Sequence, residues 1–216
     1  MNRARPIRVL LCLAALAVAR AEIIDRIAVS VGSRVITETD LDLEIRITAL
    51  QNGVKPDFSP QNKRQTAERM VDQLLVRNEL EASRYPLPSA ADVDAALKEE
   101  KERFPTDAAY RRALAEYGVS EEDLKARLLL QLTLVRFIDV RFRPGVQISD
   151  EEIRTYFNDH VRAAAQAHPD RTPSLDDYRE GIERTLIGQA ANQQVETWLK
   201  EARRRTRVQY HDEVFQ

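Results

Sequence analysis

Side chains that commonly carry catalysis or bind metals are few and scattered in this sequence. The three histidines are His160, His168 and His211, and no H-x3-H or HExxH spacing relates them. Serines and acids are plentiful, but neither a G-x-S-x-G segment nor a phosphate-binding loop is present. We therefore expect no catalytic residue, no metal site and no cofactor, and we interpret the histidines as solvated side chains.

Charged residues occur in three short runs. Residues 98–103 and 121–125 mix acids and bases at helical spacing, which is typical of exposed helix faces. The run at 203–207 contains four arginines. Cations at the end of a helix offset its negative terminus, and we favour this interpretation over a contact with anionic lipid or lipopolysaccharide.

The N-terminal segment has the pattern of a secretory signal peptide over residues 1–21. Three arginines precede an apolar run at 9–19, and Ala19-Arg20-Ala21 offers an A-x-A site for cleavage between Ala21 and Glu22. Eleven residues are too few to span a bilayer as a helix. Cys12 lies inside the apolar run and not after it, which argues against the alternative of a lipoprotein. We expect a periplasmic protein.

Cleavage would change both the charge and the cysteine content. Residues 1–21 hold four of the 33 basic residues and no acid, so 29 bases would remain against 35 acids, a net charge of −6. This balance predicts no binding to nucleic acid. Cys12 is the only cysteine, so the mature chain could form no disulfide. No later segment reaches 18 uninterrupted apolar residues, so we expect no membrane span.

The periodicity of the remaining chain predicts a mainly α fold with a small antiparallel sheet. Ile27, Val29 and Val31 alternate with other residues, so they should share one face of a strand; Gly32-Ser33 follows, which predicts a β-hairpin. Capping signals then predict helices that begin after Thr39, Ser59, Ser89, Thr106, Ser120 and Ser149. The second of these helices should run to about Tyr85, and the third should end at Pro105.

Three further expectations concern the second half of the chain. The helix after Ser120 is apolar around its circumference, and we expect it to be the central buried helix. A loop should follow at 161–175, before a last helix that starts at Asp176 or Asp177. A terminal strand with Val208, Tyr210 and the pair Val214-Phe215 should pair with the hairpin, since two strands alone are marginal.

Four segments resemble the N-terminal domain of the SurA family of periplasmic chaperones. They are 25–41 (DRIAVSVGSRVITETDL), 70–75 (MVDQLL), 118–124 (GVSEEDL) and 148–153 (ISDEEI). Together the segments extend through most of residues 23–160, in the order that the family shows. The resemblance implies a chaperone domain at 22–160, and a C-terminal helix and strand at 176–216 that complete the same domain.

The sequence departs from the family at residues 161–175. SurA-like proteins usually carry parvulin prolyl isomerase domains of roughly 90–100 residues there. This chain has six glycines and no Gly-Gly pair, whereas parvulins have a Gly-Gly-x-Leu-Gly stretch. We therefore expect the isomerase domain to be absent and the protein not to be an enzyme.

The resemblance implies an ATP-independent holdase that binds unfolded outer-membrane or exported proteins through apolar surfaces. It also allows a homodimer, because domains of this kind can exchange helices. Large rings near helix ends are candidate client contacts, and these are Phe104, Tyr110, Tyr117 and Phe142. Two alternatives remain, a non-catalytic accessory subunit of an envelope complex and a degenerate prolyl isomerase.

Overall fold

The chain folds as a mainly helical protein with a small three-stranded antiparallel sheet, as predicted. The computed structural model describes residues 25–83, 85–163 and 173–216. The expected signal peptide, the cleavage site between Ala21 and Glu22, and His168 lie outside the described residues. Most of the loop expected at 161–175 also lies outside them.

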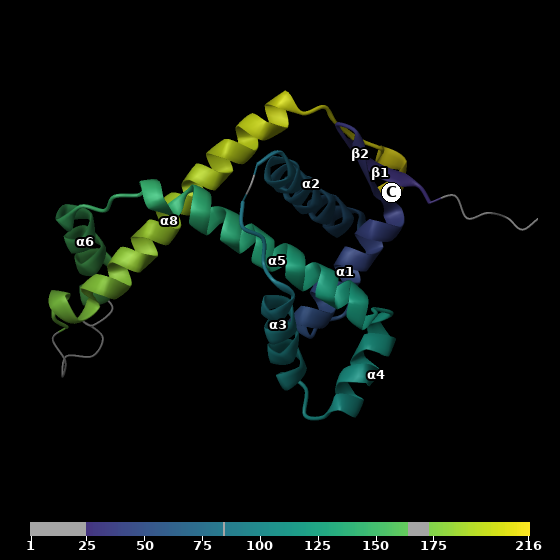
Figure 1. Cartoon of the computed structure of the whole chain (residues 1–216), viewed down its shortest axis with the longest axis horizontal. Helices are drawn as coiled ribbons and strands as arrows, with labels where there is room; N and C mark the ends of the chain where they lie inside the picture. Colours follow the sequence, from purple (N-terminus) through teal and green to yellow (C-terminus); the bar gives the residue numbers. More distant parts are fainter. Residues whose placement is uncertain (1–24, 84, 164–172) are drawn as a thin grey trace, which may run out of the picture.

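The helices follow one another with short connections, and Figure 1 shows their arrangement. Helix α5 runs diagonally through the middle of the molecule, with α2 on one side and α3 and α4 on the other. The principal helices are α1 (Glu38–Asn52), α2 (Pro60–Ala82), α3 (Ala90–Glu102), α4 (Asp107–Tyr117), α5 (Glu121–Arg141), α6 (Asp150–Tyr156) and α8 (Leu175–Arg205). The short helical segments are η1 (Arg143–Gly145), η2 (Phe157–Arg162) and η3 (Asp212–Val214).

The sheet joins the two ends of the described chain. Strands β1 (Ile27–Val31) and β2 (Arg34–Thr37) form the hairpin, and β3 (Val208–Tyr210) pairs antiparallel with the other edge of β1. Gly32 adopts a φ of 60° in the hairpin turn, and its N–H donates to the Arg207 carbonyl at 2.9 Å. The predicted pairing of the C-terminal strand with the hairpin is confirmed.

Two details of the strands differ from the predictions. The β1–β2 register shifts between Ile27 and Val29, so Ile27 is 42% exposed while Ala28 and Val29 are buried. An irregularity of this kind breaks the two-residue alternation from which a shared face was predicted. Val214 is not in a strand but in η3, where it is buried beneath the sheet core.

Of the six helix starts predicted from capping signals, five are confirmed and one is wrong. Helices α2 to α6 begin after Ser59, Ser89, Thr106, Ser120 and Ser149. Helix α1 begins earlier than predicted, because the N-cap is Thr37 and not Thr39. Thr37 accepts from the Asp40 N–H at 3.2 Å, and Asp40 accepts from the Thr37 N–H at 3.0 Å.

Several helix ends also lie elsewhere than predicted. Helix α2 ends at Ala82, before Tyr85, and α3 ends at Glu102, before Pro105. Residues 161–162 belong to η2, a segment of π-helix, so they are not part of a loop. Helix α8 begins at Leu175 rather than at Asp176 or Asp177, and Ser174 makes no side-chain cap there. Such terminal turns depend on local packing more than on the sequence pattern.

The largest buried cluster lies between the sheet and helices α1 and α2. It contains Ala28, Val29, Val31, Ile36, Leu41, Ile45, Ala67, Val71, Leu75 and Val214. A second cluster joins α1, α3, α4 and the first half of α5, and a third surrounds Phe137 where α8 crosses α5. Helix α8 connects this body to a smaller lobe formed with α6 and η2, at the left of Figure 1.

Candidate functional site

A continuous groove runs between helices α2 and α5. It consists of two adjoining cavities that share Arg77, Ala126 and Leu130 in their walls. The larger cavity has a volume of about 400 Å³ and the smaller about 270 Å³. We call the whole depression the α2–α5 groove.

The larger cavity is predominantly apolar. Its walls come from the second half of α2, the middle of α5, and the Leu87-Pro88 connection that precedes α3. The apolar side chains are Val76, Leu80, Leu87, Pro88, Ala126, Leu129, Leu130 and Leu134. Leu87 is 62% exposed and Leu129 is 42% exposed. Large apolar side chains that stay solvent-accessible along a depression are a common feature of binding grooves.

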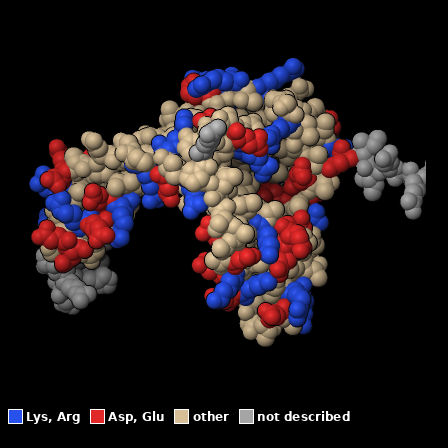
Figure 2. Space-filling model, viewed as in Figure 1, with Lys and Arg blue, Asp and Glu red and all other residues tan. Residues whose placement is uncertain are grey.

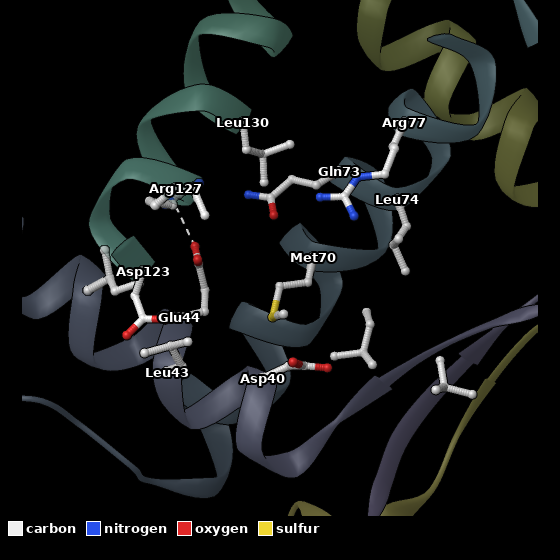
Figure 3. A pocket seen from close by; sticks show the side chains of 14 residues that line it. Asp40, Leu43, Glu44, Met70, Gln73, Leu74, Arg77, Asp123, Arg127 and Leu130 are labelled. Carbon is white, nitrogen blue, oxygen red and sulfur yellow. Dashed lines mark ion pairs between the residues drawn. The ribbon is translucent and has the colours of Figure 1, made fainter. Parts of the chain in front are cut away.

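The smaller cavity combines apolar and polar walls, and Figure 3 shows it from close by. Leu43, Ile47, Met70, Leu74 and Leu130 form most of its apolar part, and Val35 and Ile36 of β2 also line it. Asp40, Glu44, Gln73, Arg77, Asp123 and Arg127 bring polar atoms to it. Elements far apart in sequence therefore build this end of the groove.

Glu44 of α1 and Arg127 of α5 form a buried ion pair among the residues that line the groove. Glu44 Oε1 lies 3.0 Å from an Arg127 guanidinium nitrogen, and the two side chains are 9% and 14% exposed. Burial raises the pKa of Glu44, and this effect outweighs the attraction of Arg127 and Arg69, which lowers it. The pair therefore fixes α1 against α5 and makes one groove wall locally polar.

The prediction that α5 is the central buried helix is wrong in part. Leu124, Leu128 and Phe137 are buried, but Leu129, Val135 and Val140 are 42%, 55% and 43% exposed. Helix α5 is central in position (Figure 1), yet part of its apolar circumference is exposed. Leu129 was predicted to be buried because an apolar helix face has the same periodicity whether it is covered or exposed.

The four predicted client contacts do not line the α2–α5 groove. Tyr110 is 3% exposed and Phe142 is 7% exposed, so the expectation that these rings are accessible is wrong. Tyr110 packs in the α1–α3–α4–α5 cluster with Phe104, at a ring centroid distance of 5.5 Å. Tyr117 is half-buried and donates to the Val54 carbonyl at 2.9 Å. Position near a helix end did not indicate exposure, because other helices cover these ends.

The described histidines lie apart from one another. The His160 ring lies 4.3 Å from the Tyr156 ring, tilted by 44°, and His211 Nε2 lies 3.2 Å from the Ser30 hydroxyl. Over the ranges that the structure describes, no three His, Cys, Asp or Glu side chains gather as a metal site would require. Of the helices in the same ranges, none combines the length and apolarity needed to cross a membrane.

The C-terminal arginine run is partly engaged within the protein. Arg203 Nε donates to Asp72 at 2.7 Å, and its guanidinium also donates to the Glu68 carbonyl at 2.9 Å. Arg204 pairs with Glu201 at 2.6 Å. On the face shown in Figure 2, acidic and basic side chains are interspersed without a large area of one sign.

Groove residues that sequence reasoning missed are Gln73, Arg77, Leu87 and Leu129. The surplus of apolar residues on α5, more than one helix face requires, was the available signal for Leu129. Nothing in the sequence distinguishes Arg77 from other helix-surface arginines.

No protein-family model matches the chain, and a search of the curated proteins finds no match.

Proposed function

We propose that this protein is a periplasmic, ATP-independent holdase that binds unfolded outer-membrane or exported proteins in the α2–α5 groove. The observation that carries the proposal is the groove itself, with exposed Leu87 and Leu129 on its walls. The resemblance of four segments to SurA-like chaperones supports the same function, and the signal-peptide pattern supports the compartment.

The dimensions of the groove suit segments of unfolded chain. A cavity of about 400 Å³ admits one or two large apolar side chains of a client. Each such side chain contributes roughly 1.5–3 kcal/mol when it leaves water completely. A few of these contacts, reduced by the cost of ordering the client, give weak and reversible binding. A holdase that must release its client without ATP requires binding of this strength.

Leu129 offers a direct test because α5 provides a matched control. Leu129 and Val140 lie on the same helix with exposures of 42% and 43%, but only Leu129 lines the groove. The protein for this test begins at residue 22, after the expected cleavage site, and so retains every described residue. Wild type, Leu129→Ser and Val140→Ser would each be mixed at near-stoichiometric ratio with an outer-membrane protein diluted from urea, without ATP.

We expect wild type and Val140→Ser to suppress aggregation, measured by light scattering, and Leu129→Ser to suppress it at least severalfold less. Circular dichroism would verify that all three proteins are folded. Failure of folded wild type to suppress aggregation would contradict the holdase function. Capture of one stoichiometric partner would then favour an accessory subunit. Equal activity of the two variants would contradict the assignment of binding to the groove.

A further inference from the structure

The charged side chains that line the α2–α5 groove are nearly all engaged within the protein. Glu44 pairs with Arg127 at 3.0 Å, and Glu81 pairs with Arg34 of β2. The two remaining acids are members of helix capping boxes. Asp40 accepts from the Thr37 N–H at 3.0 Å, and Asp123 accepts from the Ser120 N–H at 2.9 Å and its hydroxyl at 2.6 Å.

Arg77 is the exception among these charged lining residues, all of which belong to the described part of the chain. No ion pair or side-chain hydrogen bond joins Arg77 to another described residue. Glu81, one turn further along α2, is directed to Arg34 instead. The Arg77 guanidinium therefore keeps its donors available beside an apolar depression.

Arg77 also occupies a particular place in the groove. It lines both cavities, so it stands where they meet. In Figure 3 its guanidinium points toward the side of the cavity where the amide of Gln73, one turn earlier on α2, also lies. The Gln73 side chain makes no hydrogen bond to another described residue and can both donate and accept. The junction thus offers unused donors next to the apolar walls.

We infer that the α2–α5 groove prefers extended client segments in which an aspartate or glutamate lies two residues from a bulky apolar residue. The apolar side chain occupies the larger cavity, and the carboxylate binds Arg77. Side chains two residues apart in an extended chain point to the same face and lie about 6.6 Å apart, so the carboxylate can reach the junction while the apolar side chain is buried. The guanidinium can hold a carboxylate through two parallel hydrogen bonds. This inference rests on the proposed function.

The acids that line the groove already have partners, which explains why we expect the groove to prefer a glutamate over a lysine in the client. A lysine at the same place in the client would meet Arg77 as a like charge, while the nearest acids already have partners. A glutamate would instead add the partner that Arg77 lacks. We expect a ratio of roughly three- to tenfold in Kd between two peptides that differ only by glutamate and lysine.

The probes are fluorescein-labelled ten-residue peptides in which leucines alternate with serines and one central leucine is replaced by glutamate, glutamine or lysine, amidated at the C-terminus. Fluorescence anisotropy gives Kd for the chain from residue 22, for Arg77→Ala, and for Arg77→Lys. Arg111→Ala is the matched control, because Arg111 is an exposed arginine on α4 outside the groove. A fourth peptide, with central glutamine and a free C-terminus, tests whether a terminal carboxylate serves equally.

We expect the glutamate peptide to bind wild type and Arg111→Ala most tightly and the lysine peptide least tightly. The difference should vanish in Arg77→Ala, persist in part in Arg77→Lys, and shrink at 0.5 M salt because screening weakens exposed charge pairs.

If all peptides bound wild type equally and Leu129→Ser weakened the binding of each one, this inference would be overturned and the proposed function would stand. A glutamate preference that survives Arg77→Ala would also overturn it. A free terminus that binds as tightly as the glutamate peptide would overturn the preference for side-chain carboxylates. Absence of any peptide binding would overturn both the inference and the proposed function.

Discussion

At the scale of single residues, the buried pair Glu44–Arg127 is the main electrostatic feature of the groove. Both side chains are largely removed from water, and Glu44 Oε1 and Arg127 Nε make no hydrogen bond of good geometry among the described residues. The Coulomb attraction therefore only partly compensates the loss of hydration. The raised pKa of Glu44 reflects this balance.

Glu44 predicts a specific pH dependence of stability. Because its pKa is raised in the folded state, the folded protein binds the proton more tightly than the unfolded chain does. The stabilising contribution of Glu44 is complete below its ordinary value of 4.5 and is lost as pH rises through the folded pKa. The Glu44→Gln variant lacks this titration.

Urea unfolding of wild type and Glu44→Gln between pH 4 and 7 measures the effect. We expect the stability of wild type relative to the variant to decrease as pH rises above 4.5, by at most about 1.4 kcal/mol per pH unit. Carboxyls with lowered pKa, such as those of Asp150 and Glu152, give the opposite slope, but both proteins share them. A stability difference that is constant with pH would contradict the raised pKa.

At the scale of elements, the start of α1 shows how a capping signal can be ambiguous. Thr37 and Thr39 each have an acid three residues later, Asp40 and Asp42. Both fit the capping-box pattern, and we predicted the second, Thr39, as the N-cap. The structure places Thr37 at the end of β2, where its φ of −92° and ψ of 167° suit an N-cap. The helix therefore begins directly after β2, with Thr37 and not Thr39 as its N-cap.

Substitution of the two threonines by alanine distinguishes these assignments. We expect Thr37→Ala to lower the free energy of unfolding by about 1 kcal/mol, because it removes the hydroxyl that accepts from the Asp40 N–H. Thr39→Ala should cost less than half as much, since the Thr39 N–H still donates to Asp25. Urea unfolding at pH 7 provides the measurement. A larger loss of stability in Thr39→Ala than in Thr37→Ala would indicate that Thr39 is the N-cap.

Much of this fold follows from local signals, but the groove does not. Helix caps are formed by residues that are close in sequence, such as Ser120 with Asp123 at a helix start and Gly118, with a φ of 61°, at a helix end. The sequence pattern can therefore predict them. The exposure of Leu129 and the burial of Tyr110 instead depend on which helix lies opposite. Apolar periodicity identifies a face that could be buried, whereas tertiary packing determines whether it is.

At the scale of the whole molecule, the apolar contacts are distributed unevenly. The cluster beneath the sheet has ten buried members and includes Val214 from the end of the chain. The cluster of α6, η2 and α8 has three, Ile153, Phe157 and Ile182. The ion pair between Arg179 and Asp150 that also joins α6 to α8 is exposed, and such pairs contribute about 1 kcal/mol or less. The small lobe therefore has much less to hold it together.

We expect the lobe to open locally while the sheet core stays folded, because local stability follows buried apolar contact. Native-state hydrogen exchange should give a lower opening free energy for the amides of Ile153, Phe157 and Ile182 than for Val29 and Leu41. Ile182→Ala should lower the lobe values by roughly 2 kcal/mol or more and leave the core values unchanged. Leu41→Ala is the reciprocal control, since it should lower the core values and leave the lobe values unchanged while the lobe exchanges by local opening. If Ile182→Ala lowered every amide equally, the lobe and the core would be one cooperative unit.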